Sequence, residues 1–245
     1  AASGQESLFA SSTEDHDATY PTFVKVEGWT NEEALIKEKN VLGFYLSGSP
    51  LEKYQLDLDE FSNINLDKIP EKKPKTIKLG GIVQKINKRY DKKNRQWAII
   101  ELHGNIGKAD VFVFSNVFEK YNNLLIEDEC LFITGTPSNR DEEDDSLKLI
   151  AEKIYPLSNI RQTLSQSINI LITPNHTMED MLDKLKLLSK ENAGQCSLVL
   201  HLKSENGGIQ KIKSNEVKVS SNINFLKELR GVFGNKNVWI GTGER

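Results

Sequence analysis

Residues 76–86 read "TIKLGGIVQKI", and this stretch decides how the middle of the chain folds. Apolar residues and a glycine recur at every second position, at Ile77, Leu79, Gly81 and Val83. A period of two predicts a β-strand with one buried face, and the adjacent glycines at 80–81 permit a bulge or a tight bend within it. We therefore expect a β domain to begin here.

Four further strand patterns follow before residue 158. They are "WAIIEL" (97–102), "ADVFVF" (109–114), "ECLFITG" (129–135) and "SLKLIAEKIYPL" (146–157). Between the third and fourth, "SNVFEKYNNLL" (115–125) has helical spacing of its apolar residues. Five strands with one helix between the third and fourth predict an OB-fold, a small Greek-key barrel, over residues 75–160.

The segments on either side of the barrel have different patterns. Residues 1–28 lack periodicity and predict a flexible segment, and residues 29–74 predict a helical connector. In the connector, Thr30 and Glu33 have the spacing of a capping box, and Ser49-Pro50 is expected to stop the helix. Residues 165–245 alternate as β-α-β-β-α-β, which predicts a small α+β sandwich domain. The predicted fold class is therefore mixed.

The charges are distributed unevenly along the chain. The formal net charge is −3, yet residues 68–97 hold eleven bases against two acids, a net of +9. Residues 127–145 reverse this with eight acids and one Arg. A concentrated basic block favours a polyanionic partner, most simply nucleic acid.

The basic block falls on the first strand and first turn of the predicted barrel. OB-folds contact nucleic acid with their second and third strands and their first and last turns. Cations bind phosphates and aromatic rings stack on bases. The candidate nucleic-acid-binding residues are Lys85, Lys88, Arg89, Tyr90, Lys92, Lys93, Arg95, Trp97 and Phe112, with Phe114 as a further aromatic. In the other interpretation, Trp97 and one of the two Phe fill the barrel core. The acidic turn 141–145 repels phosphates, so we expect weak, salt-sensitive, sequence-independent binding of single strands.

The sequence contains no pattern typical of an active site. The four histidines are far apart and none has metal-site spacing to a cysteine, so we predict no catalytic residue and no metal ligand. No glycine-rich phosphate loop follows a strand. The chain shows no signal peptide and no run of 18 apolar residues, so we expect a cytoplasmic protein that does not cross a membrane.

One stretch resembles a known family. "EALIKEKNVLGFYLSGSPLEKY" (33–54) is similar to the segment ahead of the OB domain in the alpha subunits of bacterial DNA polymerase III, with Ser49 in place of the usual His. "ADVFVF", "ITGTP" and "LKLIAEKIYPL" resemble that OB domain, although "LHGNIG" departs from the family's pattern at one turn. Residues 168–240 resemble the family's C-terminal domain.

The resemblance implies partners. In this family a Q-x-[SD]-L-F segment binds the beta sliding clamp, and Gln5, Ser7, Leu8 and Phe9 match it. The C-terminal domain would bind the tau subunit of the clamp loader, with Phe233, Val238, Trp239 and Ile240 as candidates and Trp239 equally compatible with a core position.

The resemblance also bears on activity. The parent chain would be a DNA-directed DNA polymerase that uses Mg²⁺, whereas this part would need no cofactor and would be non-catalytic. The rival hypothesis is a free-standing OB-fold protein that binds single-stranded nucleic acid or tRNA.

Overall fold

The computed structural model describes residues 27–138, 147–173, 178–204 and 206–243. The chain divides into two compact units, residues 1–46 and residues 47–245, so the division falls inside the predicted connector. The described part of the first unit holds one helix, α1 (Asn31–Leu42), which begins with the predicted capping box. The Thr30 backbone N–H donates to Glu33 Oε2 (2.9 Å), and the Glu33 N–H donates to Thr30 Oγ1 (3.3 Å). The helix ends earlier than predicted, because Gly43 adopts a left-handed conformation (φ 84°).

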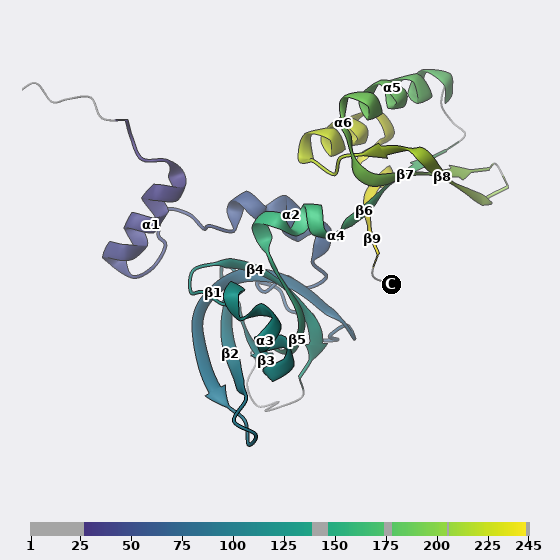
Figure 1. The fold of residues 1–245 in the computed structure, drawn as a ribbon. Helices are drawn as coiled ribbons and strands as arrows, with labels where there is room; N and C mark the ends of the chain where they lie inside the picture. Colours follow the sequence, from purple (N-terminus) through teal and green to yellow (C-terminus); the bar gives the residue numbers. More distant parts are fainter. Residues whose placement is uncertain (1–26, 139–146, 174–177, 205, 244–245) are drawn as a thin grey trace, which may run out of the picture. The chain divides into compact units, whose positions relative to one another are not determined.

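The second unit contains the predicted barrel (Figure 1). Its elements are β1 (Ile77–Tyr90), β2 (Gln96–His103), β3 (Lys108–Val113), α3 (Ser115–Tyr121), a 3-10 turn (Asn122–Leu124), β4 (Cys130–Pro137) and β5 (Leu147–Pro156). The strands close in the order β1-β2-β3-β5-β4. All pairs are antiparallel except β3 with β5. This topology, with α3 between β3 and β4, confirms the OB-fold.

Alternation along the strands builds the barrel core. In β2 the side chains of Ala98, Ile100 and Leu102 have no exposed surface, while their neighbours are partly exposed. The ladder irregularity in β1 lies between Val83 and Lys85 rather than at the glycine pair. The glycines instead permit close packing. A Cβ at Gly80 would overlap the side chain of Leu58, and one at Gly81 would lie 2.7 Å from the His103 carbonyl oxygen.

Short helices connect the barrel to the rest of the second unit. A 3-10 turn (Glu52–Tyr54) leads into α2 (Gln55–Phe61), while another 3-10 turn (Leu157–Asn159) and α4 (Ile160–Leu164) follow the barrel. Arg161 of α4 forms an ion pair with Asp57 of α2 (2.6 Å). Glu60 of α2 accepts hydrogen bonds from Arg230 (2.6 Å) and from the backbone N–H of Ile240 (3.1 Å).

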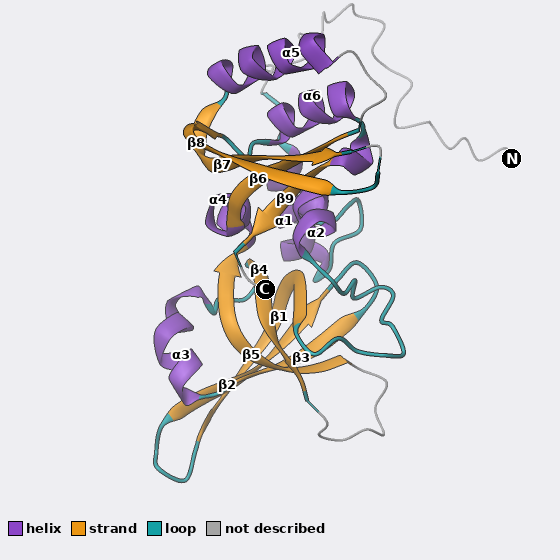
Figure 2. Ribbon diagram, turned by 90° about the vertical axis from the view of Figure 1, so that its right-hand side faces the viewer, coloured by secondary structure: helices purple, strands orange, loops and turns teal. Residues whose placement is uncertain are grey.

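The C-terminal segment forms the predicted β-α-β-β-α-β unit. It consists of β6 (Ser165–Ile172), α5 (Met178–Glu191), β7 (Ala193–Lys203), β8 (Ile209–Val219), α6 (Ile223–Phe233), a 3-10 turn (Asn235–Asn237) and β9 (Val238–Thr242). The sheet order is β8-β7-β6-β9, and β6 pairs parallel with β7. Both α5 and α6 lie on the same face of this sheet (Figure 2). Of the helices in the described residues, none is long and apolar enough to cross a membrane.

Candidate nucleic-acid interface

Three aromatic rings cluster on the outside of the barrel. The rings of Trp97 and Phe114 have centroids 5.8 Å apart, and those of Phe112 and Phe114 stack at 6.4 Å with an interplanar angle of 18°. Neither Trp97 nor Phe112 belongs to the buried core, and Phe114 is 38% exposed. The interpretation that Trp97 and one Phe fill the barrel core is therefore wrong, because all three rings lie outside the core. Strand alternation explains this, because Trp97 precedes the inward-facing Ala98.

A basic hairpin flanks the aromatic cluster. Arg89 of β1 pairs directly with Trp97 of β2, and its guanidinium carbon lies 6.0 Å from the centre of the indole ring. Lys85 pairs with Glu101 and shares the outer face with Arg89, whereas Lys88 pairs with Ala98 and lies on the other face of the hairpin. A cavity of about 670 Å³ lies between the hairpin and the start of α3. Its lining includes Tyr90, Lys92, Arg95, Trp97 and Phe114.

Asp91 fixes the turn of this hairpin. Its Oδ1 accepts hydrogen bonds from the backbone N–H groups of Lys93 (2.8 Å) and Arg95 (2.9 Å), and its Oδ2 accepts one from Arg95 Nε (2.9 Å). These hydrogen bonds, the Arg95 backbone N–H first among them, hold the pKa of the Asp91 carboxyl below its usual value. Asn94 completes the turn in a left-handed conformation (φ 58°). The charge of Arg95 is therefore committed to Asp91, and Lys92 and Lys93 carry the positive charge of the turn.

The opposite end of the same outer face is mixed in charge, because Glu101 and Asp110 lie among Lys85, Lys108 and His103. Glu101 of β2 pairs directly with Asp110 of β3. His103 Nε2 lies 2.6 Å from Glu101 Oε1, and this hydrogen bond is the main reason that the pKa of Glu101 is lowered. The hairpin end, with Arg89, Lys92 and Lys93, is therefore the more basic end of this face. The alternation in β2 that directs Trp97 outward also directs Glu101 outward.

Two predicted features lie outside the described residues. The candidate clamp-binding residues Gln5, Ser7, Leu8 and Phe9 precede residue 27, and the acidic turn 141–145 falls in the gap between residues 138 and 147. Their predicted roles stay predictions.

The four candidate tau-binding residues differ in exposure. Phe233, Val238 and Ile240 are buried, with 5%, 2% and 8% of their surface exposed. Trp239 is 37% exposed, and its ring centroid lies 4.9 Å from that of His201. Of the four, Trp239 alone offers substantial surface to a partner.

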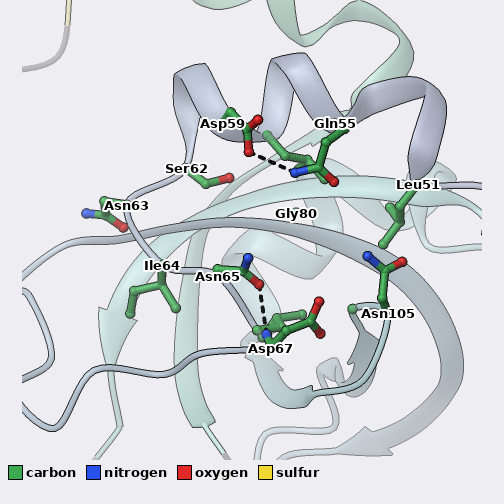
Figure 3. Close-up of a pocket in the computed structure, with 13 residues that line it drawn as sticks. Leu51, Gln55, Asp59, Ser62, Asn63, Ile64, Asn65, Asp67, Gly80 and Asn105 are labelled. Carbon is green, nitrogen blue, oxygen red and sulfur yellow. Dashed lines mark hydrogen bonds between the residues drawn. The ribbon is translucent and has the colours of Figure 1, made fainter.

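A second cavity, of about 290 Å³, lies between α2 and the barrel (Figure 3). Its two carboxylates are engaged within the protein. Asp59 Oδ1 accepts a hydrogen bond from Gln55 Nε2 (2.8 Å), and Asp67 Oδ1 accepts from the backbone N–H groups of Ile106 (2.8 Å) and Gly107 (2.9 Å). Within the described ranges, no group of three or more His, Cys, Asp or Glu side chains could hold a metal ion. The cavity therefore offers no recognisable catalytic constellation.

Two solved structures that this chain resembles are weakly similar to it. A mitochondrial single-stranded DNA binding protein from S. cerevisiae, Rim1, matches 34% of this chain and 92% of its own, with 10% identity and a TM-score of 0.28. The S. pombe Stn1-Ten1 complex matches 47% of this chain and 76% of its own, with 12% identity and a TM-score of 0.27. These scores are too low to carry a functional argument.

Comparison with curated sequences was more informative, although no family model matches the chain. The DNA polymerase III subunit alpha of Borreliella burgdorferi is 29% identical over 255 residues, covering 97% of this chain and 21% of that protein. The corresponding subunit of Pseudomonas aeruginosa is 26% identical over 241 residues, covering 97% and 20%. That of Escherichia coli (strain K12) is 23% identical over 238 residues, covering 96% and 20%. Over nearly its whole length, this chain resembles about one fifth of the DNA polymerase III alpha subunit.

Proposed function

We propose that this chain is the C-terminal region of a DNA polymerase III alpha subunit and that its barrel holds single-stranded template DNA. The similarity to polymerase subunits over nearly the whole chain supports a role in DNA replication. The observation that carries the DNA-binding assignment is the outward-facing cluster of Trp97, Phe112 and Phe114 beside a basic hairpin.

The geometry suits single-stranded DNA that is bound through its bases and phosphates without regard to sequence. Bases stack on the Trp97 and Phe114 rings, each base contributing about 1–3 kcal/mol. Arg89, Lys92 and Lys93 neutralise the phosphates that flank the stacked bases. Every base has a π-face, so binding is independent of sequence.

Two protein partners follow from the resemblance. Gln5, Ser7, Leu8 and Phe9 bind the beta sliding clamp, since two apolar side chains in an acidic segment serve a partner's pocket better than this chain's own core. Residues 165–245 bind the tau subunit, and Trp239 is the exposed member of the predicted contacts. The parent polymerase carries out nucleotidyl transfer with Mg²⁺, and this region itself is non-catalytic.

The DNA assignment is tested by fluorescence anisotropy with a labelled oligo-dT of about 16 nucleotides, the upper end of the site size of one OB-fold. Trp97→Ala should weaken binding by about 5-fold to 150-fold, the equivalent of one lost stack. Trp29→Ala is the matched control, because Trp29 is exposed in the other unit. Equal affinities for the two variants would refute the barrel as the DNA site.

The clamp assignment is tested by titrating the chain with the beta clamp. A variant carrying Gln5→Ala, Leu8→Ala and Phe9→Ala should lose binding while its thermal unfolding stays unchanged. If the wild-type chain fails to bind the clamp, the free-standing OB-fold protein becomes the better hypothesis.

A further inference from the structure

One face of the C-terminal sheet is left uncovered by the helices that pack on the other. In β9, Trp239 lies between the buried Val238 and Ile240, so it is directed to the face opposite α5 and α6. Paired residues on neighbouring strands share a face. One row across the sheet is therefore Lys213, Val199, Asn169 and Trp239, and the next is Lys211, His201 and Leu171. In the first row Val199 and Asn169 are buried, so the accessible surface lies at its two ends, Lys213 and Trp239.

The aromatic part of this face is held in place. The His201 and Trp239 rings lie 4.9 Å apart at 40°, and His201 Nε2 lies 3.0 Å from Asn169 Oδ1. Burial, together with the charge of Lys211, lowers the pKa of His201, so its ring is neutral at pH 7. The row on one side of Trp239 holds small residues, namely Ser197, Ser167 and Gly241.

The basic part of this face lies along β8 and the end of β7. Lys211, Lys213 and Lys218 of β8 are paired with His201, Val199 and Ser197, and Lys203 follows His201 by two residues in β7. All four lysines are exposed. Within the four described strands the one acidic residue is Glu216, which lies in the irregular part of β8.

We propose that this lysine–tryptophan face, made of Trp239, His201, Lys203, Lys211, Lys213 and Lys218, is a second binding site for single-stranded nucleic acid. The lysines match the charge of the phosphates, and the exposed Trp239 ring provides the stacking surface that sheet-based binders of single strands use. An acidic protein segment would complement the lysines but would not use the ring for stacking. The proposal goes beyond the proposed function, which places DNA on the barrel alone and uses Trp239 as a contact for tau, so single strands and tau would compete for this residue.

Trp239 itself reports on this site. The chain has three Trp residues, so a Trp29→Phe, Trp97→Phe variant leaves Trp239 as the only one. Titration with oligo-dT of about 16 nucleotides should quench its fluorescence. Adding Lys211→Gln and Lys213→Gln should reduce the slope of log K against log salt by about 1.4, which weakens binding about 60-fold near 0.05 M salt. Absence of quenching, or quenching unaffected by the lysine changes, would overturn the proposal.

The controls distinguish binding at this site from non-specific attraction by positive charge and from binding at the barrel. Lys184→Gln with Lys227→Gln removes the same charge from α5 and α6, on the other face, and should leave the quenching unchanged. If duplex DNA or poly-glutamate competed for the site as well as unlabelled oligo-dT, the proposal that bases stack on Trp239 would be overturned. Changing Arg89→Gln and Lys92→Gln tests the barrel instead. If these changes leave total binding intact while Trp239 is still quenched, the proposed function fails and the second site stands.

Discussion

Arg89 and Arg95 lie on the same basic hairpin, but the structure predicts that they contribute differently to DNA binding. Arg89 is exposed beside the Trp97 ring, whereas Arg95 donates to Asp91 Oδ2 at 2.9 Å. Neutralising one phosphate of a single strand contributes about 0.7 to the slope of log K against log salt. Arg89→Gln should therefore lower the slope by about 0.7, which is about eightfold in affinity near 0.05 M salt and about threefold near 0.2 M.

The same change at Arg95 should have a much smaller effect on the slope, because an arginine already paired with a carboxylate releases no counterion when it meets a phosphate. The assay is oligo-dT anisotropy across a series of NaCl concentrations. Asp91→Asn combined with Arg95→Gln is the control, since it removes the ion pair without changing the net charge. Equal slope changes for Arg89→Gln and Arg95→Gln would refute this reasoning about the hairpin.

Three further outcomes are expected. Because the pKa of Asp91 is lowered in the folded state, its stabilisation of the hairpin turn is present above the unfolded pKa and is lost as pH falls through the folded pKa. The protection of the Lys93 and Arg95 amides, measured as their exchange rate relative to the intrinsic rate at the same pH, should fall in acid, and Asp91→Asn should remove that change in protection. Glu60→Ala should lower the free energy of unfolding by about 1.5–3 kcal/mol, since Arg230 and the Ile240 N–H both lose their acceptor; an unchanged melting temperature would contradict this. Gly135→Ala should destabilise the barrel by about 1–3 kcal/mol, because its Cβ would overlap the Ile150 carbonyl oxygen. Gly231→Ala, in helix α6 with open space around it, should instead stabilise by about 0.5–1 kcal/mol, and calorimetry distinguishes the two.

The sequence predicted the elements well where one period dominates. Strand β1 alternates from Ile77 to Val83, and α1 begins with a capping box that needs only Thr30 and Glu33. The seven-residue helix α2 was not predicted, because it is too short to show a period. It packs where Gly80 admits the Leu58 side chain, a contact between residues that are distant in sequence.

The candidate site was predicted in its composition but not in its arrangement. Basic and aromatic residues around Lys85–Trp97 could be recognised from the sequence, and Trp97 does lie beside Arg89. The pairing of Arg95 with Asp91 could not be predicted, because it depends on the geometry of the turn at Asn94. The row from Lys213 to Trp239 crosses four strands whose order the local pattern does not specify.

The contacts of Glu60 can form only late in synthesis of the chain. Its partners Arg230 and Ile240 lie 170 and 180 residues further along, beyond the whole barrel. At roughly 5–20 residues per second, about 10–35 s pass between the translation of α2 and that of its partners. Throughout that interval the Glu60 carboxylate lacks the groups that later bind it. A nascent chain that stalls just after the barrel has all five barrel strands but lacks both partners of Glu60, so this side of α2 would be exposed to chaperones and proteases.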